Sequence, residues 1–191
     1  GDVSAYSSEE IVVEPGTVSV VEISGAELLR PELWQLSDPA LYSVEVELLA
    51  GEVLDRISFR TGIRSVEFTR DGCFLNGERV ALRGCNRHES IPGIGNAMTP
   101  GLHRHDAELL REFGCNFVRL SHYPQHPVFL DACDELGILI YAEIATWKSV
   151  RGGGWLKNAR RQMRDLVRRD RHHPSVVLWG MGNEGRHRKA Y

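Results

Sequence analysis

The sequence lacks several features that would place it in a familiar class. No apolar run approaches the roughly 20 residues of a membrane-spanning helix. Positive charge is not in excess, because 23 Lys and Arg stand against 26 Asp and Glu. The four cysteines form no Cys-x-x-Cys pair. These absences argue against a membrane protein, a nucleic-acid binder and a disulfide or zinc scaffold. The compartment stays open, with the cytoplasm as the first choice.

Two catalytic motifs are also missing. There is no Gly-x-Ser-x-Gly elbow, the commonest serine hydrolase arrangement, and no His-Glu-x-x-His zinc motif. Three histidine pairs could still suggest a metal site: His103 and His105, His122 and His126, His172 and His173. Gly93-Ile94-Gly95 begins like a dinucleotide-binding loop, but its third glycine is absent. A metal site and a small nucleotide-binding oxidoreductase therefore remain minor alternatives.

Residues 1–69 have the pattern of an all-β domain. Polar and apolar residues alternate over 17–20, 42–48 and 57–59, which predicts strands with one buried face. Turn residues separate these segments. Only four or five strands fit, whereas an immunoglobulin-like sandwich needs about seven. We therefore expect part of an antiparallel sandwich.

From about residue 70 the pattern changes to α/β. An Asn76-Gly77 turn predicts a small hairpin over 71–78. Apolar runs typical of parallel strands buried on both faces then alternate with helical segments. The runs cover residues 80–82, 117–120, 138–141 and 176–179.

Three helices are predicted between these runs, and each has an apolar stripe. The first has Thr99 as N-cap, Pro100 as its first residue and Gly114 as its stop, and the second ends at Gly137. The stripes consist of Leu102, Leu109, Leu110 and Phe113; Phe129, Cys133 and Leu136; and Leu156, Ala159, Met163, Leu166 and Val167. The order is that of a parallel βαβαβαβ unit.

Polar or ionisable residues follow each apolar run, at 83–89, 121–124, 142–147 and 180–185. Ligands of parallel α/β folds bind at the carboxyl ends of the strands, so we expect a site there. Asn183-Glu184 is the clearest candidate. Partial burial at a crowded rim would favour protonated Glu184 and suit it to general acid catalysis. A glutamate in a loop or helix cap would fit the same spacing.

Three motifs together resemble glycoside hydrolase family 2, which includes β-galactosidases, β-glucuronidases and β-mannosidases. They are Arg83-Gly84-Cys85-Asn86-Arg87-His88-Glu89, Asn116-Phe117-Val118-Arg119-Leu120-Ser121-His122-Tyr123-Pro124 and Trp179-Gly180-Met181-Gly182-Asn183-Glu184. The stretch 33–42 is similar to the immunoglobulin-like domain that precedes the catalytic barrel of this family. The resemblance implies a (β/α)₈ barrel and a retaining mechanism with two carboxylates.

The resemblance also implies roles for individual residues. Glu184 corresponds to the general acid/base, and Asn183 to the residue that binds the sugar 2-hydroxyl. His88 and His122 correspond to sugar-contacting histidines. Arg119 corresponds to the arginine that orients the nucleophile.

Two departures from the family pattern carry expectations of their own. Residues 144–147 lack the acid-x-His pair with which some β-galactosidases bind magnesium, so we expect no metal and no other cofactor here. Trp147 at that place would form an apolar wall for a sugar or aglycone, or simply pack within its loop. The nucleophile of the family ends the seventh barrel strand, and no residue of this chain takes that role. Glu143 corresponds to a supporting acid.

The resulting prediction is an α/β fold made of about four βα units. Residues 1–69 would be the C-terminal part of an immunoglobulin-like domain, and residues 70–191 the first half of a TIM barrel. The function expected is that of a segment of a retaining exo-β-glycosidase, β-galactosidase before β-glucuronidase or β-mannosidase. Its partners would be a carbohydrate β-glycoside, the rest of the barrel and further copies of the full-length chain. A non-catalytic carbohydrate-binding or interaction module is the alternative.

Overall fold

The computed structural model describes residues 6–8, 10–23, 28–148 and 150–185. The chain divides into two units, Gly1–Glu32 and Leu33–Tyr191. The described residues of the first unit contain no helix or strand, so the strand predicted over 17–20 is wrong. Val18 and Val20 are more than 90% exposed. Alternation alone does not make a strand, because a strand also needs a neighbour to complete its hydrogen bonds.

The second unit contains an antiparallel hairpin of β1 (Tyr42–Ala50) and β2 (Glu52–Thr61), which confirms the strands predicted there. The buried face that their alternation predicts is not found. The exposed apolar residues of the hairpin include Val46, Leu48, Leu49, Val53, Leu54 and Ile57. Strands of a sandwich bury one face only where a second sheet packs on it. The immunoglobulin-like architecture therefore stays a prediction.

A second antiparallel sheet consists of β3 (Val66–Thr69), β4 (Gly72–Leu75) and β5 (Glu78–Val80). Asn76 and Gly77 have φ values of 52° and 81°, as a type I′ turn requires, which confirms the predicted hairpin. The β3–β4 pairing spans the domain boundary predicted after residue 69. That boundary stays a prediction.

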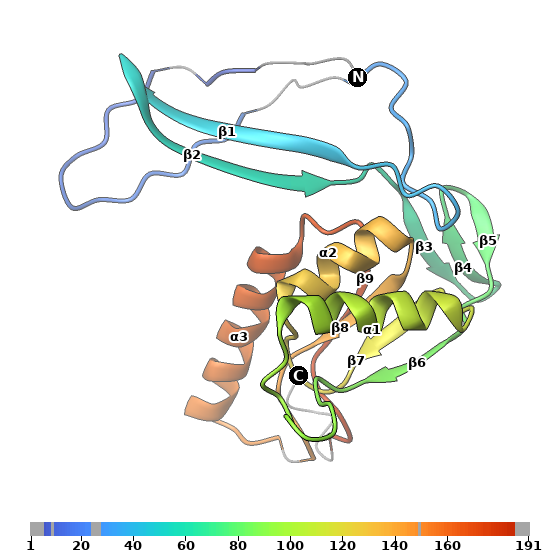
Figure 1. The fold of residues 1–191 in the computed structure, drawn as a ribbon. Helices are drawn as coiled ribbons and strands as arrows, with labels where there is room; N and C mark the ends of the chain where they lie inside the picture. The colour runs from blue at the N-terminus through green and yellow to red at the C-terminus, as the bar shows by residue number, and fades with distance from the viewer. Residues whose placement is uncertain (1–5, 9, 24–27, 149, 186–191) are drawn as a thin grey trace. The chain divides into compact units, whose positions relative to one another are not determined.

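Four parallel strands form the main sheet in the order β6-β7-β8-β9 (Figure 1). They are β6 (Gly84–Arg87), β7 (Phe117–Leu120), β8 (Leu139–Glu143) and β9 (Val176–Gly180). The last three confirm the prediction. The first does not, because the apolar run 80–82 only contributes Val80 to β5. Gly84 explains the difference: a Cβ there would lie 1.6 Å from the Phe117 carbonyl oxygen, so only glycine allows this pairing.

The helices α1 (Pro100–Glu112), α2 (Pro127–Leu136) and α3 (Gly154–Asp170) pack on one face of this sheet (Figure 1). α2 ends, as predicted, at Gly137 in the left-handed conformation. The core on this face includes Val118, Leu120, Phe129, Leu130, Ile138, Ile140, Ala159 and Leu166.

α1 presents to the core a face that only partly matches the predicted stripe, because Leu110 packs against the core but Phe113 does not. Phe113 is 83% exposed, whereas His103 and Ala107 are buried. The buried positions keep the helical spacing, but one of them is a polar residue that hydrogen-bonds within the core. A pattern of apolar residues alone misses such a position.

The amino ends of the parallel strands are covered by residues from outside the sheet. Trp34 is fully buried against Leu75 of β4 and Leu139, the first residue of β8. Its indole Nε1 donates to the backbone oxygen of Asp134 on α2, at 2.8 Å. The carboxyl ends of the strands lie at the opposite end of the sheet and are followed by the polar segments 121–124, 142–147 and 180–185.

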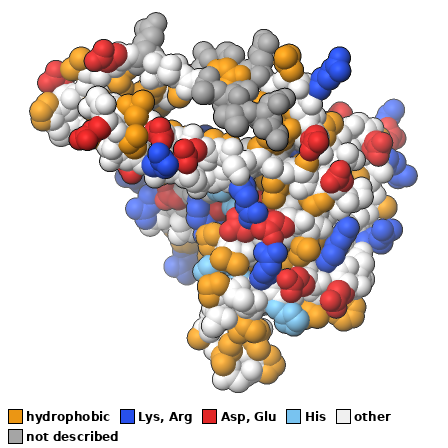
Figure 2. All heavy atoms as spheres, turned by 45° about the horizontal axis from the view of Figure 1, so that its top comes forward, with side chains coloured by type: hydrophobic (Ala, Val, Ile, Leu, Met, Phe, Trp, Pro, Cys, Tyr) orange, Lys and Arg blue, Asp and Glu red, His pale blue; other side chains and the backbone are white. Residues whose placement is uncertain are grey.

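The surface mixes charges of both signs. Figure 2 shows acidic and basic side chains close together on the visible face. Among the ion pairs of the structure, Arg60 and Arg104 both contact Glu135. Within the described part of the chain, no helix combines the length and the apolar content needed to traverse a bilayer.

Candidate active site

A fully buried carboxylate, Glu143, ends β8 and organises the polar residues around it. Arg119 of β7 donates to its Oε2 from Nε and Nη2, at 2.9 and 2.6 Å. His122 Nδ1 lies 3.0 Å from Oε1. A buried charge is tolerated only when it is paired and hydrogen-bonded, and Glu143 meets this condition on both oxygens.

The strand periodicity explains why these side chains meet. Val118 and Ile140 point into the core with the helices, so Arg119 and Glu143 point to the opposite face of the sheet. Tyr141 pairs with Arg119 across β7 and β8, and the Arg119 guanidinium lies 5.3 Å from the centre of its ring.

Asn183 joins this group from the end of β9. Its Oδ1 accepts from Arg119 Nη2 at 3.1 Å. Its backbone N–H donates to the Thr146 carbonyl oxygen at 2.8 Å, and its carbonyl oxygen accepts from the Lys148 N–H at 2.9 Å. The chain segments that follow β8 and β9 are therefore paired. Gly182 allows this approach, because a Cβ there would lie 1.8 Å from Thr146 Oγ1.

Glu184 and Trp147 are the exposed residues next to this group. Glu184 has a φ of 52°, a left-handed conformation that is uncommon outside glycine and concentrated at functional sites. Its side chain is exposed, so the partial burial expected of it is not found among the described residues. Trp147 is bridged to Asn183, is 61% exposed, and has Lys148 Nζ at 4.6 Å from its ring centre.

His88 follows β6 and completes the group. Its ring meets that of His122 edge-on, with 5.5 Å between the centres, and lies 6.0 Å from the ring of Tyr123. Arg119, His122 and Asn183 are thus brought together by contacts, with His88 beside them.

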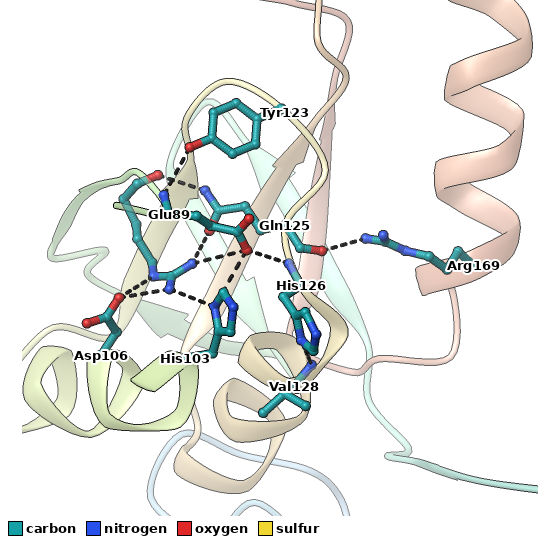
Figure 3. A network of polar contacts seen from close by, with 9 residues as sticks. Glu89, His103, Asp106, Tyr123, Gln125, His126, Val128 and Arg169 are labelled. Carbon is teal, nitrogen blue, oxygen red and sulfur yellow. Dashed lines mark hydrogen bonds and ion pairs between the residues drawn. The ribbon is translucent and has the colours of Figure 1, made fainter. Parts of the chain in front are cut away.

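The sequence reasoning missed the supporting residues. Tyr141 and Thr146 follow no motif that points to them, although both lie within or just after an apolar run. A second polar network includes Glu89, the chain neighbour of His88, with Asp106 and Gln125 (Figure 3). In it Arg87 contacts Asp106 and Gln125. Arg87 lies within the motif 83–89, which was the signal available for it in the sequence.

Among the described residues, one group could hold a metal ion: Asp131, Asp134 and His173, with ligand atoms within 4.8 Å of one another. Asp134 already accepts from Ser175 N–H at 3.0 Å and contacts His173 Nδ1 at 2.5 Å. His173 and Ser175 precede β9, at the end of the sheet opposite Glu143. We therefore interpret Asp134 and His173 as a structural pair rather than as metal ligands. Of the histidine pairs in the sequence, His172 and His173 lie together with 4.1 Å between their ring centres, whereas His103 stacks on His126, a member of another pair.

His103 gives the fold an expected pH dependence. Burial lowers its pKa below the ordinary 6.5, and His172 is shifted in the same direction by the same cause. Arg87 Nη2 lies 3.1 Å from His103 Nδ1, and a guanidinium only donates, so this nitrogen must be unprotonated. Below about pH 6.5, His103 is protonated in the unfolded chain but stays neutral in the folded one, because its pKa is lower in the fold. The contribution of His103 to the free energy of unfolding is therefore fully present above this pH and is lost progressively as the pH falls below it.

We expect the thermal midpoint to fall between pH 7.5 and pH 5.5, and to fall less in His103→Gln than in the wild type. Glutamine does not titrate, and it can still accept from Arg87. Thermal unfolding at both pH values measures the difference. An equal or larger fall in the variant would contradict the assignment.

Two family models together span nearly the whole chain. One, described as the TIM barrel domain of glycosyl hydrolases family 2, matches residues 66–191. The other, described as glycosyl hydrolases family 2, matches residues 2–64. The chain belongs to glycosyl hydrolase family 2. The four parallel strands and their helices are accordingly a fragment of its TIM barrel, preceded by an N-terminal domain.

The chain is similar to part of several longer proteins. It is 46% identical over 155 residues to a β-galactosidase of Thermoanaerobacter pseudethanolicus, covering 80% of this chain and 21% of that protein. The solved β-glucuronidase 3 of Bacteroides uniformis is 40% identical with a TM-score of 0.79, covering 87% of this chain and 22% of its own. The β-glucuronidase of Parabacteroides merdae is 37% identical with a TM-score of 0.80, and the match covers 85% of this chain and 21% of that one. The chain spans about a fifth of each relative.

Proposed function

We propose that this chain is part of a retaining exo-β-glycosidase, with the first half of the catalytic barrel and the end of an immunoglobulin-like domain before it. The observation that carries the proposal is the group of Arg119, His122 and Asn183 around the buried Glu143. This group lies at the carboxyl ends of parallel strands, where barrel enzymes bind substrate. Glu184 directly follows Asn183 in the chain.

In the proposed reaction Glu184 protonates the glycosidic oxygen while a second carboxylate, roughly 5 Å away, attacks the anomeric carbon. The bond to the leaving group breaks, and a covalent glycosyl-enzyme forms. Glu184 then takes a proton from water, which attacks the same carbon and releases the sugar. The conformation and exposure of Glu184 leave its carboxyl accessible for both proton transfers.

Arg119 is suited to hold the attacking carboxylate. Of its five N–H groups, those on Nε and Nη2 contact Glu143 and Asn183. Nη1 has no such contact in the described part of the chain, so it is available for the second carboxylate. We propose that this nucleophile is a glutamate at the end of a later barrel strand, outside these 191 residues.

The sugar would be held by the residues beside this group. Asn183 would contact its 2-hydroxyl, His88 and His122 would contact further hydroxyls, and Trp147 would cover an apolar face of the sugar or aglycone. The 61% exposure of Trp147 leaves ring surface for such contact. We propose galactose as the sugar. Glucuronic acid is the alternative, since β-glucuronidases are among the relatives of similar fold.

A panel of nitrophenyl β-galactoside, β-glucuronide and β-mannoside tests the proposal on the full-length enzyme and on the 191-residue chain. The full-length enzyme is expected to turn over the galactoside fastest, and the chain alone to show no turnover. Turnover by the isolated chain that disappears in Glu184→Gln would overturn the assignment of the nucleophile. Glycan binding without any turnover by the full-length protein would instead favour a non-catalytic carbohydrate-binding module.

A further inference from the structure

Arg87, the last residue of β6, is buried and makes polar contacts with several residues. Its partners His103, Asp106 and Gln125 are labelled in Figure 3. Its Nε and Nη2 donate to Asp106 Oδ2 at 3.0 and 2.8 Å, and its Nη1 donates to Gln125 Oε1 at 2.5 Å. Nη2 also contacts His103 Nδ1, and the guanidinium lies 3.9 Å from the centre of the Phe129 ring. Only 6% of Arg87 is exposed, so this set of partners is what makes its burial tolerable.

The backbone of Arg87 fixes the end of β6 to the chain beyond β7. Its carbonyl oxygen accepts from Ser121 N–H at 3.0 Å and from Gln125 Nε2 at 2.8 Å. Gln125 is almost fully buried, and its side-chain amide bonds both the side chain and the main chain of Arg87. These two bonds satisfy its buried polar atoms. These contacts in both directions hold the end of β6 at a fixed distance from the segment that follows β7.

Glu89 repeats this link on the other side of His88. Its Oε1 accepts from the His126 N–H at 2.5 Å, and its backbone N–H donates to the Tyr123 hydroxyl at 3.0 Å. Its carboxylate also lies 3.7 Å from Arg87 Nη1. Both chain neighbours of His88 are thus bound to the loop that follows His122.

We propose that Arg87, Glu89 and Gln125 are positioning residues that hold His88 and His122 at the separation needed to grip one sugar ring. This rests on the proposed glycosidase function. None of the three contacts the group around Glu143 in the described structure, so they act through the two histidines. A displacement of about 1 Å in groups that hold a substrate costs up to roughly a hundredfold in rate, so the histidine spacing matters.

Gln125→Met in the full-length enzyme is the first test, since methionine fills similar space but makes neither hydrogen bond to Arg87. We expect kcat/KM to fall roughly tenfold or more. Most of the fall should appear as a higher KM, because the two histidines would hold the sugar in the ground state as well as in the transition state. Asp134→Asn is the matched control, because it weakens another buried polar pair, with His173, at the opposite end of the sheet. It should lower the thermal midpoint without raising KM. A KM no higher in Gln125→Met than in this control would overturn the proposal.

Glu89 supplies a test by rescue. Glu89→Ala removes the acceptor of the His126 N–H and should raise KM in the same way, whereas Glu89→Gln keeps an acceptor and should stay within about threefold of the wild type. Equal KM values for the two variants would contradict a positioning role.

A crystal structure of Gln125→Met separates this proposal from the proposed function. It is expected to show the rings of His88 and His122 displaced from their 5.5 Å separation, whatever the enzyme's substrate. Unchanged rings would refute the positioning role even in an active enzyme. Displaced rings in a protein that hydrolyses no β-glycoside would support positioning and refute the glycosidase.

Discussion

The full-length Glu184→Gln enzyme is expected to turn over nitrophenyl β-galactoside about 10² to 10⁴ times more slowly than the wild type. Glutamine keeps the size of the side chain but has no proton to give to the leaving oxygen and no charge with which to activate water. Initial rates measured at equal concentrations of folded enzyme give the ratio.

The leaving group distinguishes general acid catalysis from simple damage to the site. A dinitrophenyl glycoside needs little protonation, so its bond-breaking step should be far less affected in Glu184→Gln. Glu112→Gln is the control, because Glu112 is an exposed glutamate at the end of α1. Equal losses for both substrates would contradict an acid role for Glu184.

Glu143→Leu is expected to destabilise the protein by about 3 kcal/mol. The substitution removes the carboxylate that pairs with Arg119 and His122 and leaves the guanidinium without its main partner, a change that costs about 3–5 kcal/mol in buried pairs. The lower figure applies because the Arg119 side chain is 26% exposed. In a domain of this size the thermal midpoint should fall by roughly 6–12 °C.

Glu143→Gln keeps an acceptor for Arg119 and should lose less stability than Glu143→Leu, while the exposed Glu112→Leu should change it by about 0.5 kcal/mol or less. Thermal unfolding of the three variants gives the order. If Glu143→Leu were no less stable than Glu112→Leu, the buried ion pair would not support the fold as described.

The sequence predicted best those elements whose signals are local. The runs that became β7, β8 and β9 are continuous and apolar, and the start of α1 and the end of α2 are marked by Pro100 and Gly137. These signals depend only on neighbouring residues. The Asn76-Gly77 turn belongs to the same class.

Elements that depend on distant partners were predicted less well. The segment 17–20 alternates like a strand but has no neighbour to pair with among the described residues, and β6 is too polar to be found by its composition. Gly84 marks β6 only once the Phe117 carbonyl is known to lie against it. Tertiary context decided both cases.

The candidate site divides in the same way. Arg119, His122 and Asn183 were chosen from motifs, and the structure places them in contact with Glu143 or with one another. Their catalytic and sugar-binding roles, with those of Glu184, His88 and Trp147, remain proposals. Gln125 was not chosen, because its bonds to Arg87 join residues 38 positions apart that no periodicity connects.

Trapping of the covalent intermediate tests the central claim most directly. The reagent is a 2-deoxy-2-fluoro β-glycoside of the sugar that the panel selects, with an activated leaving group. The fluorine slows hydrolysis of the glycosyl-enzyme, so the labelled peptide of the full-length enzyme can be mapped by mass spectrometry. We expect one sugar on a glutamate outside residues 1–191, with Glu184 unlabelled. A sugar on Glu143, on Glu184 or on any other residue of this chain would contradict it.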